Sequence, residues 1–233
     1  MARRGKEVVM SNVLNSCRKG SRVVSSRLYA PVHAIIRRAF PMLSLRRFWD
    51  KKAEHLHRQW GGWTHDFEVI ADCVHTFKAH SVLDVGCGDG RLFPLYYESG
   101  LRFCGCDLSN AALRLARSRY PAADLRLIAA EDISLSSLGQ TFDLAVCNRV
   151  LQHVRPATID RAVRGISEAV SSVYINEIAI EDVPAGTEYL FGHAYTALFG
   201  NAGFKLVSSG WIQPGALAPQ QWFLFKKATA EAA

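Results

Sequence analysis

VLDVGCGDG, residues 82–90, is the most informative segment of this 233-residue chain. An apolar run typical of a buried strand leads into three glycines at alternate positions, and a helical pattern follows. Glycine permits a tight turn and lets a ligand approach the backbone closely. The start of the following helix presents free N–H groups and a partial positive charge. The segment therefore predicts a strand, a turn and a helix, with a binding site at the turn.

Around this segment, short apolar runs alternate with helical patterns from residue 81 onward. Five strands are expected, at 81–85, 102–107, 125–129, 142–148 and 172–177. Three helices are expected between them, at 90–98, 110–120 and 157–170, and Ser109 is the predicted N-cap of the second. Such alternation is typical of right-handed βαβ crossovers, which build a parallel, doubly wound sheet.

The C-terminal part follows a different pattern. After a helical pattern at 193–202, strands are expected at 205–211 and 221–226, joined by a loop that contains proline and glycine but no helix. Such a connection favours antiparallel pairing. We therefore predict an α/β fold with a doubly wound, Rossmann-like sheet of seven strands, mostly parallel and with an antiparallel last strand. Upstream, helices at 45–58 and 64–78 are expected to form an N-terminal helical lid.

Carboxylates follow the next two predicted strands. Asp107 comes 23 residues after Asp84, where a carboxylate can accept hydrogen bonds from both hydroxyls of a ribose. Glu131-Asp132 follows the third strand, where a carboxylate could meet an exocyclic adenine amine. A dinucleotide-binding turn would need glycine at position 91, which is arginine, so nicotinamide and flavin pyrophosphates are disfavoured.

The chain resembles a class I S-adenosylmethionine-dependent methyltransferase. The motifs that carry the resemblance are, in order, Asp84-x-Gly86-x-Gly88-x-Gly90, Asp107, Glu131-Asp132, and Phe142-Asp143 followed by VLQHV at 150–154. The likeness runs from about residue 81 to 227. It implies S-adenosyl-L-methionine as the cofactor and S-adenosyl-L-homocysteine as the product. No metal is expected, since the six cysteines include no C-x-x-C pair.

Within the superfamily, residues 150–154 and His193-x-Tyr195 resemble the small-molecule branch, which acts on quinone precursors, sugars and natural products. The Asn-Pro-Pro-Tyr signature of nucleic-acid N-methyltransferases is missing, because Cys-Asn-Arg-Val stands at 147–150. The resemblance therefore implies a small-molecule acceptor and argues against a nucleic-acid partner.

The resemblance also implies a set of cofactor-binding residues: Asp84, Gly86, Cys87, Gly88, Asp107, Leu108, Asp132, Ile133 and Asn148. Gly86 and Gly88 would lie against the methionine portion, and Asp107 would hold the ribose. Asp132 and the backbone of Ile133 would bracket the adenine, while Asn148 would border the sulfonium. The alternatives are structural, since Asp84 could cap the turn, Asp107 could cap the next helix, and Asp132 could lie in a surface loop.

His153 is the predicted catalytic residue, because a hydroxyl acceptor gains about 10²–10⁴-fold in rate from a base that takes its proton. The predicted substrate-binding residues are His193, Tyr195 and Trp49. Each has a structural alternative: His153 could pack under the sheet edge, His193 and Tyr195 could merely start a helix, and Trp49 could belong to a packed core or lid. O-methylation of a small molecule is therefore the expected reaction.

Positive charge is concentrated at the N-terminus. Residues 1–48 hold eleven Lys or Arg and one acid, whereas residues 49–233 hold 17 bases and 20 acids. We divide the chain into a basic amphipathic arm (1–48), a helical lid (49–80) and a methyltransferase domain (81–233). The arm could cover the domain as a helical cap, contact an anionic membrane through residues 1–40, bind nucleic acid or target an organelle.

No clean run of about twenty apolar residues is present. A cytoplasmic protein is therefore expected, either free or peripheral to a membrane, and a lipid-linked acceptor is an option that the arm raises. Two other functions stay open. One is a protein or RNA methyltransferase that grips its polymer with the arm, and the other is a catalytically silent partner that keeps the fold. The oligomeric state is not determined by these patterns.

Overall fold

The computed structural model describes residues 41–60, 64, 66–183, 189–213 and 219–228. The chain divides into two compact units, residues 1–44 and 45–233. The described part of the first unit consists of residues 41–44, with which helix α3 (Pro41–Trp60) begins. The predicted membrane, targeting and nucleic-acid roles of residues 1–40 lie outside the described residues.

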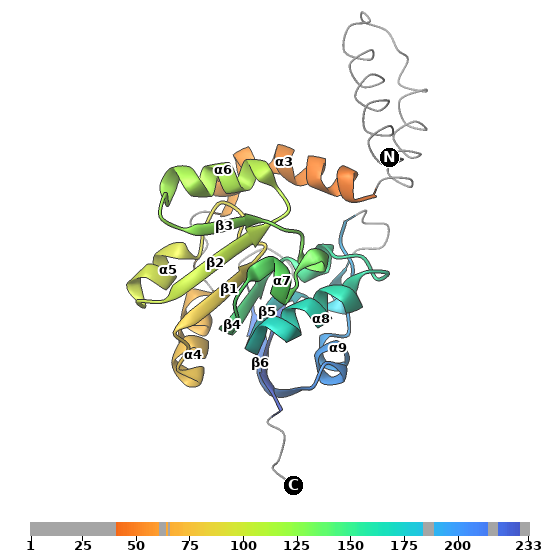
Figure 1. Ribbon diagram of the computed structural model, residues 1–233. Coiled ribbons are helices and arrows are strands. Elements are labelled where there is room, and N and C mark those ends of the chain that lie inside the picture. Colours follow the sequence, from red (N-terminus) through yellow and green to blue (C-terminus); the bar gives the residue numbers. More distant parts are fainter. Residues whose placement is uncertain (1–40, 61–63, 65, 184–188, 214–218, 229–233) are drawn as a thin grey trace, which may run out of the picture. The chain divides into compact units, whose positions relative to one another are not determined.

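The second unit is built on one seven-stranded sheet in the order β3-β2-β1-β4-β5-β7-β6 (Figure 1). Its strands are β1 (Ser81–Val85), β2 (Arg102–Asp107), β3 (Asp124–Leu127), β4 (Phe142–Asn148), β5 (Val170–Ile178), β6 (Phe204–Ile212) and β7 (Gln220–Lys227). The first five strands pair in parallel, whereas β7 pairs antiparallel with both β5 and β6. The predicted fold class is confirmed, including the antiparallel last strand.

Helices cover both faces of this sheet. The remaining α-helices are α4 (Phe67–Phe77), α5 (Phe93–Glu98), α6 (Asn110–Arg119), α7 (Leu135–Leu138), α8 (Ile159–Ala169) and α9 (Tyr195–Asn201). Three short 3₁₀ helices are η1 (Ala130–Asp132), η2 (Leu151–His153) and η3 (Ile180–Asp182). Helices α4, α5 and α6 form one core layer with Leu144 and Val146 of β4, whereas α7, α8 and α9 form the other with Ala145 and Cys147. Alternate residues of a strand face opposite layers, so both layers are buried against the same sheet.

Local sequence explains where two of the helices begin. The predicted helix at 90–98 begins only at Phe93, because Gly90 has a φ of +84°, which a right-handed helix does not accommodate. Helix α6 begins where predicted, since the Ser109 hydroxyl accepts the Ala112 N–H at 3.1 Å and caps its first turn.

The two N-terminal helices differ in extent from the predicted ones. Helix α3 begins at Pro41, which is a favourable first helical residue because its fixed φ suits the helix and its missing N–H is not needed there. A boundary at residue 48 therefore falls inside α3. No helix in the described ranges is long and apolar enough to cross a membrane.

Gly165 in α8 provides a test of the layer packing. A Cβ atom at this position would lie 2.0 Å from the carbonyl oxygen of Ile133, whereas a Cβ at Gly200 in α9 would meet nothing within 4 Å. We expect Gly165→Ala to lower the free energy of unfolding by about 1–3 kcal/mol through overpacking. Gly200→Ala should leave it unchanged or raise it by up to about 1 kcal/mol, because alanine favours helix. Urea denaturation of both variants measures this, and equal effects would contradict the packing described.

Candidate active site

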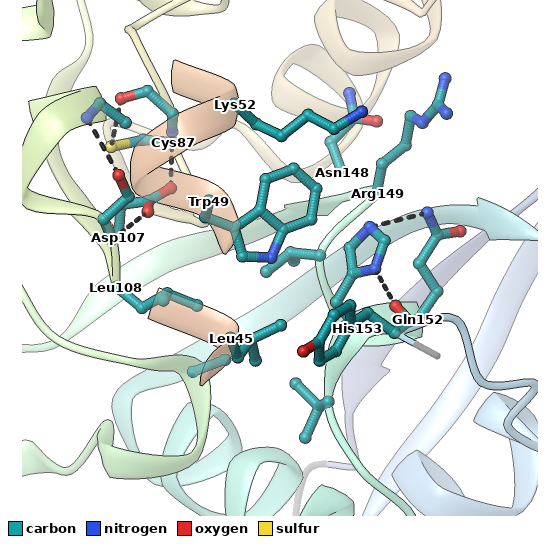
Figure 2. A pocket seen from close by; sticks show the side chains of 18 of the residues that line it. Leu45, Trp49, Lys52, Cys87, Asp107, Leu108, Asn148, Arg149, Gln152 and His153 are labelled. Atoms are coloured by element: carbon teal, nitrogen blue, oxygen red, sulfur yellow. Dashed lines mark hydrogen bonds between the residues drawn. The ribbon is translucent and has the colours of Figure 1, made fainter. Parts of the chain in front are cut away.

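A cavity of about 620 Å³ lies at the carboxyl ends of the parallel strands. This is the edge at which open α/β sheets bind ligands. The cavity is lined by the glycine-rich turn after β1, the end of β2, the start of η1, the segment after β4, and α3 (Figure 2). Nine predicted site residues line it together: Asp84, Gly86, Cys87, Gly88, Asp107, Leu108, Asn148, His153 and Trp49. Their individual roles remain predictions.

The glycine-rich turn is held in a conformation that favours glycine. Gly86 and Gly88 have φ values of +71° and +57°, and a Cβ at Gly86 would lie 2.5 Å from the Val150 side chain. The N–H groups of Gly86 and Cys87 both donate to the carbonyl of Cys106, at 2.7 and 3.0 Å. The turn therefore binds the end of β2 and packs against the segment after β4.

Asp84 is buried at the base of this turn. Burial raises the pKa of its carboxyl to about 7, although nearby Arg91 opposes the shift. Its Oδ2 atom has no hydrogen-bond partner among the described residues, because the neighbouring Tyr96 hydroxyl falls short of hydrogen-bond geometry. A buried carboxylate oxygen without a partner is costly, and a cationic or N–H donor in the cavity would relieve that cost.

Asp107 is oriented by backbone donors. Its Oδ2 accepts the Gly88 N–H at 2.9 Å, and its Oδ1 accepts the Ser109 N–H at 2.7 Å. Burial raises the pKa of this carboxyl to about 6, against the opposing effect of these hydrogen bonds. Since a carboxylate oxygen can accept two hydrogen bonds, each oxygen keeps acceptor capacity for a ligand. Both sides of the ribose prediction, a fixed carboxylate and free acceptor capacity, are met.

Asn148 belongs to a buried polar network beside the cavity. Its Nδ2 donates to Asp66, which also accepts both guanidinium nitrogens of Arg91 at 2.9 and 2.8 Å. Its Oδ1 accepts the Asn176 side chain at 3.3 Å. Bidentate pairing with Arg91 fixes Asp66, and through it the position of Asn148.

The predicted adenine-binding residues do not line the cavity. The Asp132 side chain is 61% exposed and pairs with Arg161 at 3.2 Å, while Ile133 is buried in the core beside α8. Glu131 lines the cavity instead, and burial raises the pKa of its carboxyl. Successive side chains of a 3₁₀ helix diverge by roughly 120°, so only one of these two neighbouring carboxylates can face the ligand. The sequence identified the segment but not the side chain.

His153 faces the cavity as a neutral imidazole. Its Nδ1 donates to the carbonyl of Tyr189, which can only accept, so Nδ1 carries the proton. Its Nε2 accepts the Gln152 amide at 3.3 Å, and the carbonyl of that amide accepts the Ile178 N–H at 2.9 Å. Burial, with a smaller contribution from Arg149, lowers the pKa of the imidazole to about 4. At neutral pH, Nε2 therefore holds a lone pair that can accept a proton.

The other predicted acceptor residues lie on different sides of the cavity wall. Trp49 lines the cavity and packs edge-on against His153, with ring centroids 4.7 Å apart. His193 is buried behind the wall, where its Nε2 donates to the Val154 carbonyl at 2.8 Å, and Tyr195 is buried in the core. Neither His193 nor Tyr195 lines the cavity, so the geometry does not support their predicted contact with a substrate.

Several lining residues escaped sequence reasoning. Leu45, Phe48 and Lys52 lie on the same face of α3 as Trp49 and line the cavity. Their spacing of three to four residues is the signal that could have revealed them.

Glu177 is a further residue that the sequence analysis did not single out. It is fully buried at the end of β5, and its Oε1 accepts the N–H groups of Val150 and Leu151 at 3.0 and 2.7 Å. It therefore positions the segment that carries Arg149, whose φ is +60°, and His153. A lone acid within an apolar strand was the available signal.

Burial raises the pKa of Glu177 to about 8. Between its unfolded value of about 4.5 and this value, the folded state binds more protons than the unfolded state, so Glu177 makes stability fall as pH rises. Glu177→Gln keeps the accepting oxygen and cannot ionise. We expect the stability of the variant relative to the wild type to rise by a few kcal/mol between about pH 5 and pH 8. Urea denaturation at both pH values measures it, and a difference independent of pH would refute the shift, because all other groups titrate in both proteins.

Comparison with known proteins agrees with this geometry. Residues 83–172 match the family model described as a methyltransferase domain. The chain is 35% identical over 141 residues to the ubiquinone biosynthesis O-methyltransferase of Pseudomonas paraeruginosa (strain DSM 24068 / PA7). It is 27% identical over 142 residues to the same enzyme of Bordetella bronchiseptica. These alignments cover 57% of this chain and 58% and 56% of the relatives, so the chain spans less than two thirds of the length of the curated relatives it matches.

Solved structures show the same fold. The Burkholderia thailandensis 1,6-didemethyltoxoflavin-N1-methyltransferase, with S-adenosylhomocysteine bound, has a TM-score of 0.63 at 19% identity, over 90% of this chain and 93% of that one. The Synechocystis PCC 6803 magnesium protoporphyrin IX methyltransferase, with SAM bound, has a TM-score of 0.57 at 18% identity, over 71% and 78%. Family match and fold together identify the chain as a member of the class I S-adenosylmethionine-dependent methyltransferases, which confirms the prediction from the motifs.

Proposed function

We propose that this chain transfers a methyl group from S-adenosylmethionine to a hydroxyl of a small-molecule acceptor. The observation that carries the proposal is that one cavity holds both the Asp84–Asp107 carboxylates beside the glycine-rich turn and a neutral His153 with a free Nε2 lone pair. The names of the relatives, O-methyltransferases of ubiquinone biosynthesis, support a hydroxyl acceptor.

The residues around the turn fit the cofactor. The unpartnered Oδ2 of Asp84 suits the cofactor's ammonium group, and the fixed carboxylate of Asp107 suits the two ribose hydroxyls. Gly88 would leave open space even for a Cβ, so its backbone is accessible from the cavity. Glu131 takes the place predicted for Asp132 at the adenine end. When bound, the cofactor supplies an electrophilic methyl group on a sulfonium.

The contribution of the protein is then geometry and proton transfer. Holding two reactants in near-attack contact can lower a barrier by roughly 7–11 kcal/mol. Trp49 and Phe48 on α3 cover the cavity and keep water from His153. Nε2 of His153 accepts the proton of the acceptor hydroxyl, while the Tyr189 carbonyl keeps Nδ1 protonated and the ring oriented. The lowered pKa makes the imidazolium short-lived.

Asp107→Ala tests the cofactor site. A hydrogen bond to a charged group contributes about 1.5–3 kcal/mol, so affinity for S-adenosylhomocysteine should fall by about 10- to 150-fold. Titration calorimetry of the full chain measures this. The control is Asp72→Ala, which changes an exposed carboxylate on α4 outside the cavity and should leave the affinity unchanged. Unaltered affinity in Asp107→Ala would remove the ribose assignment.

His153→Ala tests the proton acceptor. Transfer to catechols and phenols, followed as S-adenosylhomocysteine release, should slow by about 10²–10⁴-fold at saturating acceptor. Cofactor affinity should stay within about twofold, because His153 lies at the acceptor end of the cavity. His75→Ala, on the exposed face of α4, serves as the matched control. Full turnover by the His153 variant would show that it plays no part in proton transfer.

A further inference from the structure

The cavity is divided by charge. Its acidic lining residues all follow β1, β2 or β3: Asp84, Asp89, Asp107 and Glu131. The opposite end contains no acid among its described lining residues, and two cations lie there, Lys52 from α3 and Arg149 after β4. In Figure 2 the Lys52 side chain extends from α3 toward Asn148 and Arg149, away from Asp107 and Cys87. A third lining cation, Arg91, is engaged by Asp66.

The same end of the cavity has aromatic walls. The Phe48 ring lies 5.2 Å from that of Trp49 and 5.0 Å from that of Tyr189, and Trp49 lies 4.7 Å from His153. Four linked rings on one side of a cavity favour a flat, aromatic ligand, because rings pair by offset or edge-to-face contact.

The two cations are held differently. Lys52 is exposed along much of its length and lies over the Phe48 ring, with its Nζ 5.6 Å from the centroid. Arg149 is largely buried in a left-handed backbone conformation, which the Glu177 carboxyl supports by accepting the next two N–H groups. Such backbone strain persists only where the surroundings enforce it. A planar guanidinium with a neighbouring ammonium matches a carboxylate well.

We propose that the acceptor is an aromatic acid, whose carboxylate binds to Lys52 and Arg149 while its ring lies against Phe48, Trp49 and Tyr189. The inference rests on the proposed function and specifies its substrate class. It places the anionic group at the end of the cavity remote from Asp84 and Asp107, where like charges do not repel it. The ring hydroxyls then lie within the part of the cavity that His153 borders.

The test compares two probes that differ only in charge, 3,4-dihydroxybenzoate and 3,4-dihydroxybenzamide. Each is titrated by calorimetry into the full chain saturated with S-adenosylhomocysteine. We expect the benzoate to bind at least about tenfold more tightly than the benzamide, and the difference to shrink as ionic strength rises.

Variants of α3 identify the cation responsible. Lys52→Gln should reduce the preference for the benzoate to about threefold or less, and Lys52→Glu should reverse it. Lys51→Gln removes the neighbouring exposed charge, which does not line the cavity, and should keep the full preference. Arg149→Gln, accompanied by a melting temperature to check folding, should also reduce the preference.

The outcomes separate the two proposals. If S-adenosylhomocysteine does not bind, the proposed function fails. If it binds but the benzamide binds as tightly as the benzoate, or neither probe binds, the aromatic-acid inference is overturned and the methyltransferase proposal stands. An unchanged preference in both Lys52 variants also overturns it.

Discussion

The close contact between the Gly86 backbone and the Val150 side chain is the constraint on which the site depends. A single Cβ at position 86 would lie 2.5 Å from Val150, so only glycine lets the turn after β1 approach the segment after β4 this closely. The Cys106 carbonyl, which accepts two N–H groups of the same turn, adds the end of β2. Three strand ends thus meet at one short turn, and the cavity opens above it.

Buried carboxyl groups surround this turn, and they are costly. Burial raises the pKa values of Asp84, Asp107 and Glu177 to about 7, 6 and 8. Backbone N–H groups compensate Asp107 and Glu177, whereas Asp84 keeps an oxygen without a partner. Perturbed groups of this kind cluster at functional sites, because a fold retains an unsatisfied polar group where a ligand will satisfy it. The uneven compensation distinguishes Glu177, which orients the chain, from Asp84, which awaits a donor.

Charge separation gives the cavity a direction. Acids gather at the end built by β1, β2 and β3, while Lys52, Arg149 and the neutral His153 occupy the end built by β4 and α3. A cationic cofactor and an anionic acceptor would therefore be drawn to opposite ends, with the reacting groups between them. Helix α3 contributes to this arrangement through Asp50, which accepts the Ser109 hydroxyl at 2.7 Å and joins α3 to the start of α6.

Patterns local in the chain were enough to predict the sheet, the order of its layers and the turn at 82–90, because apolar periodicity and glycine act over a few residues. They were also enough to bring nine site residues to one edge, since parallel strands end together. Which of Glu131 and Asp132 faces the ligand depended on the rotation of a 3₁₀ helix, and this rotation is fixed by packing against α8. His193 and Tyr195 fell behind the cavity wall, and Lys52 and Phe48 came to line it, because contacts between distant segments set the orientation of α3 and of the segment after β4. No pattern within one segment encodes those contacts.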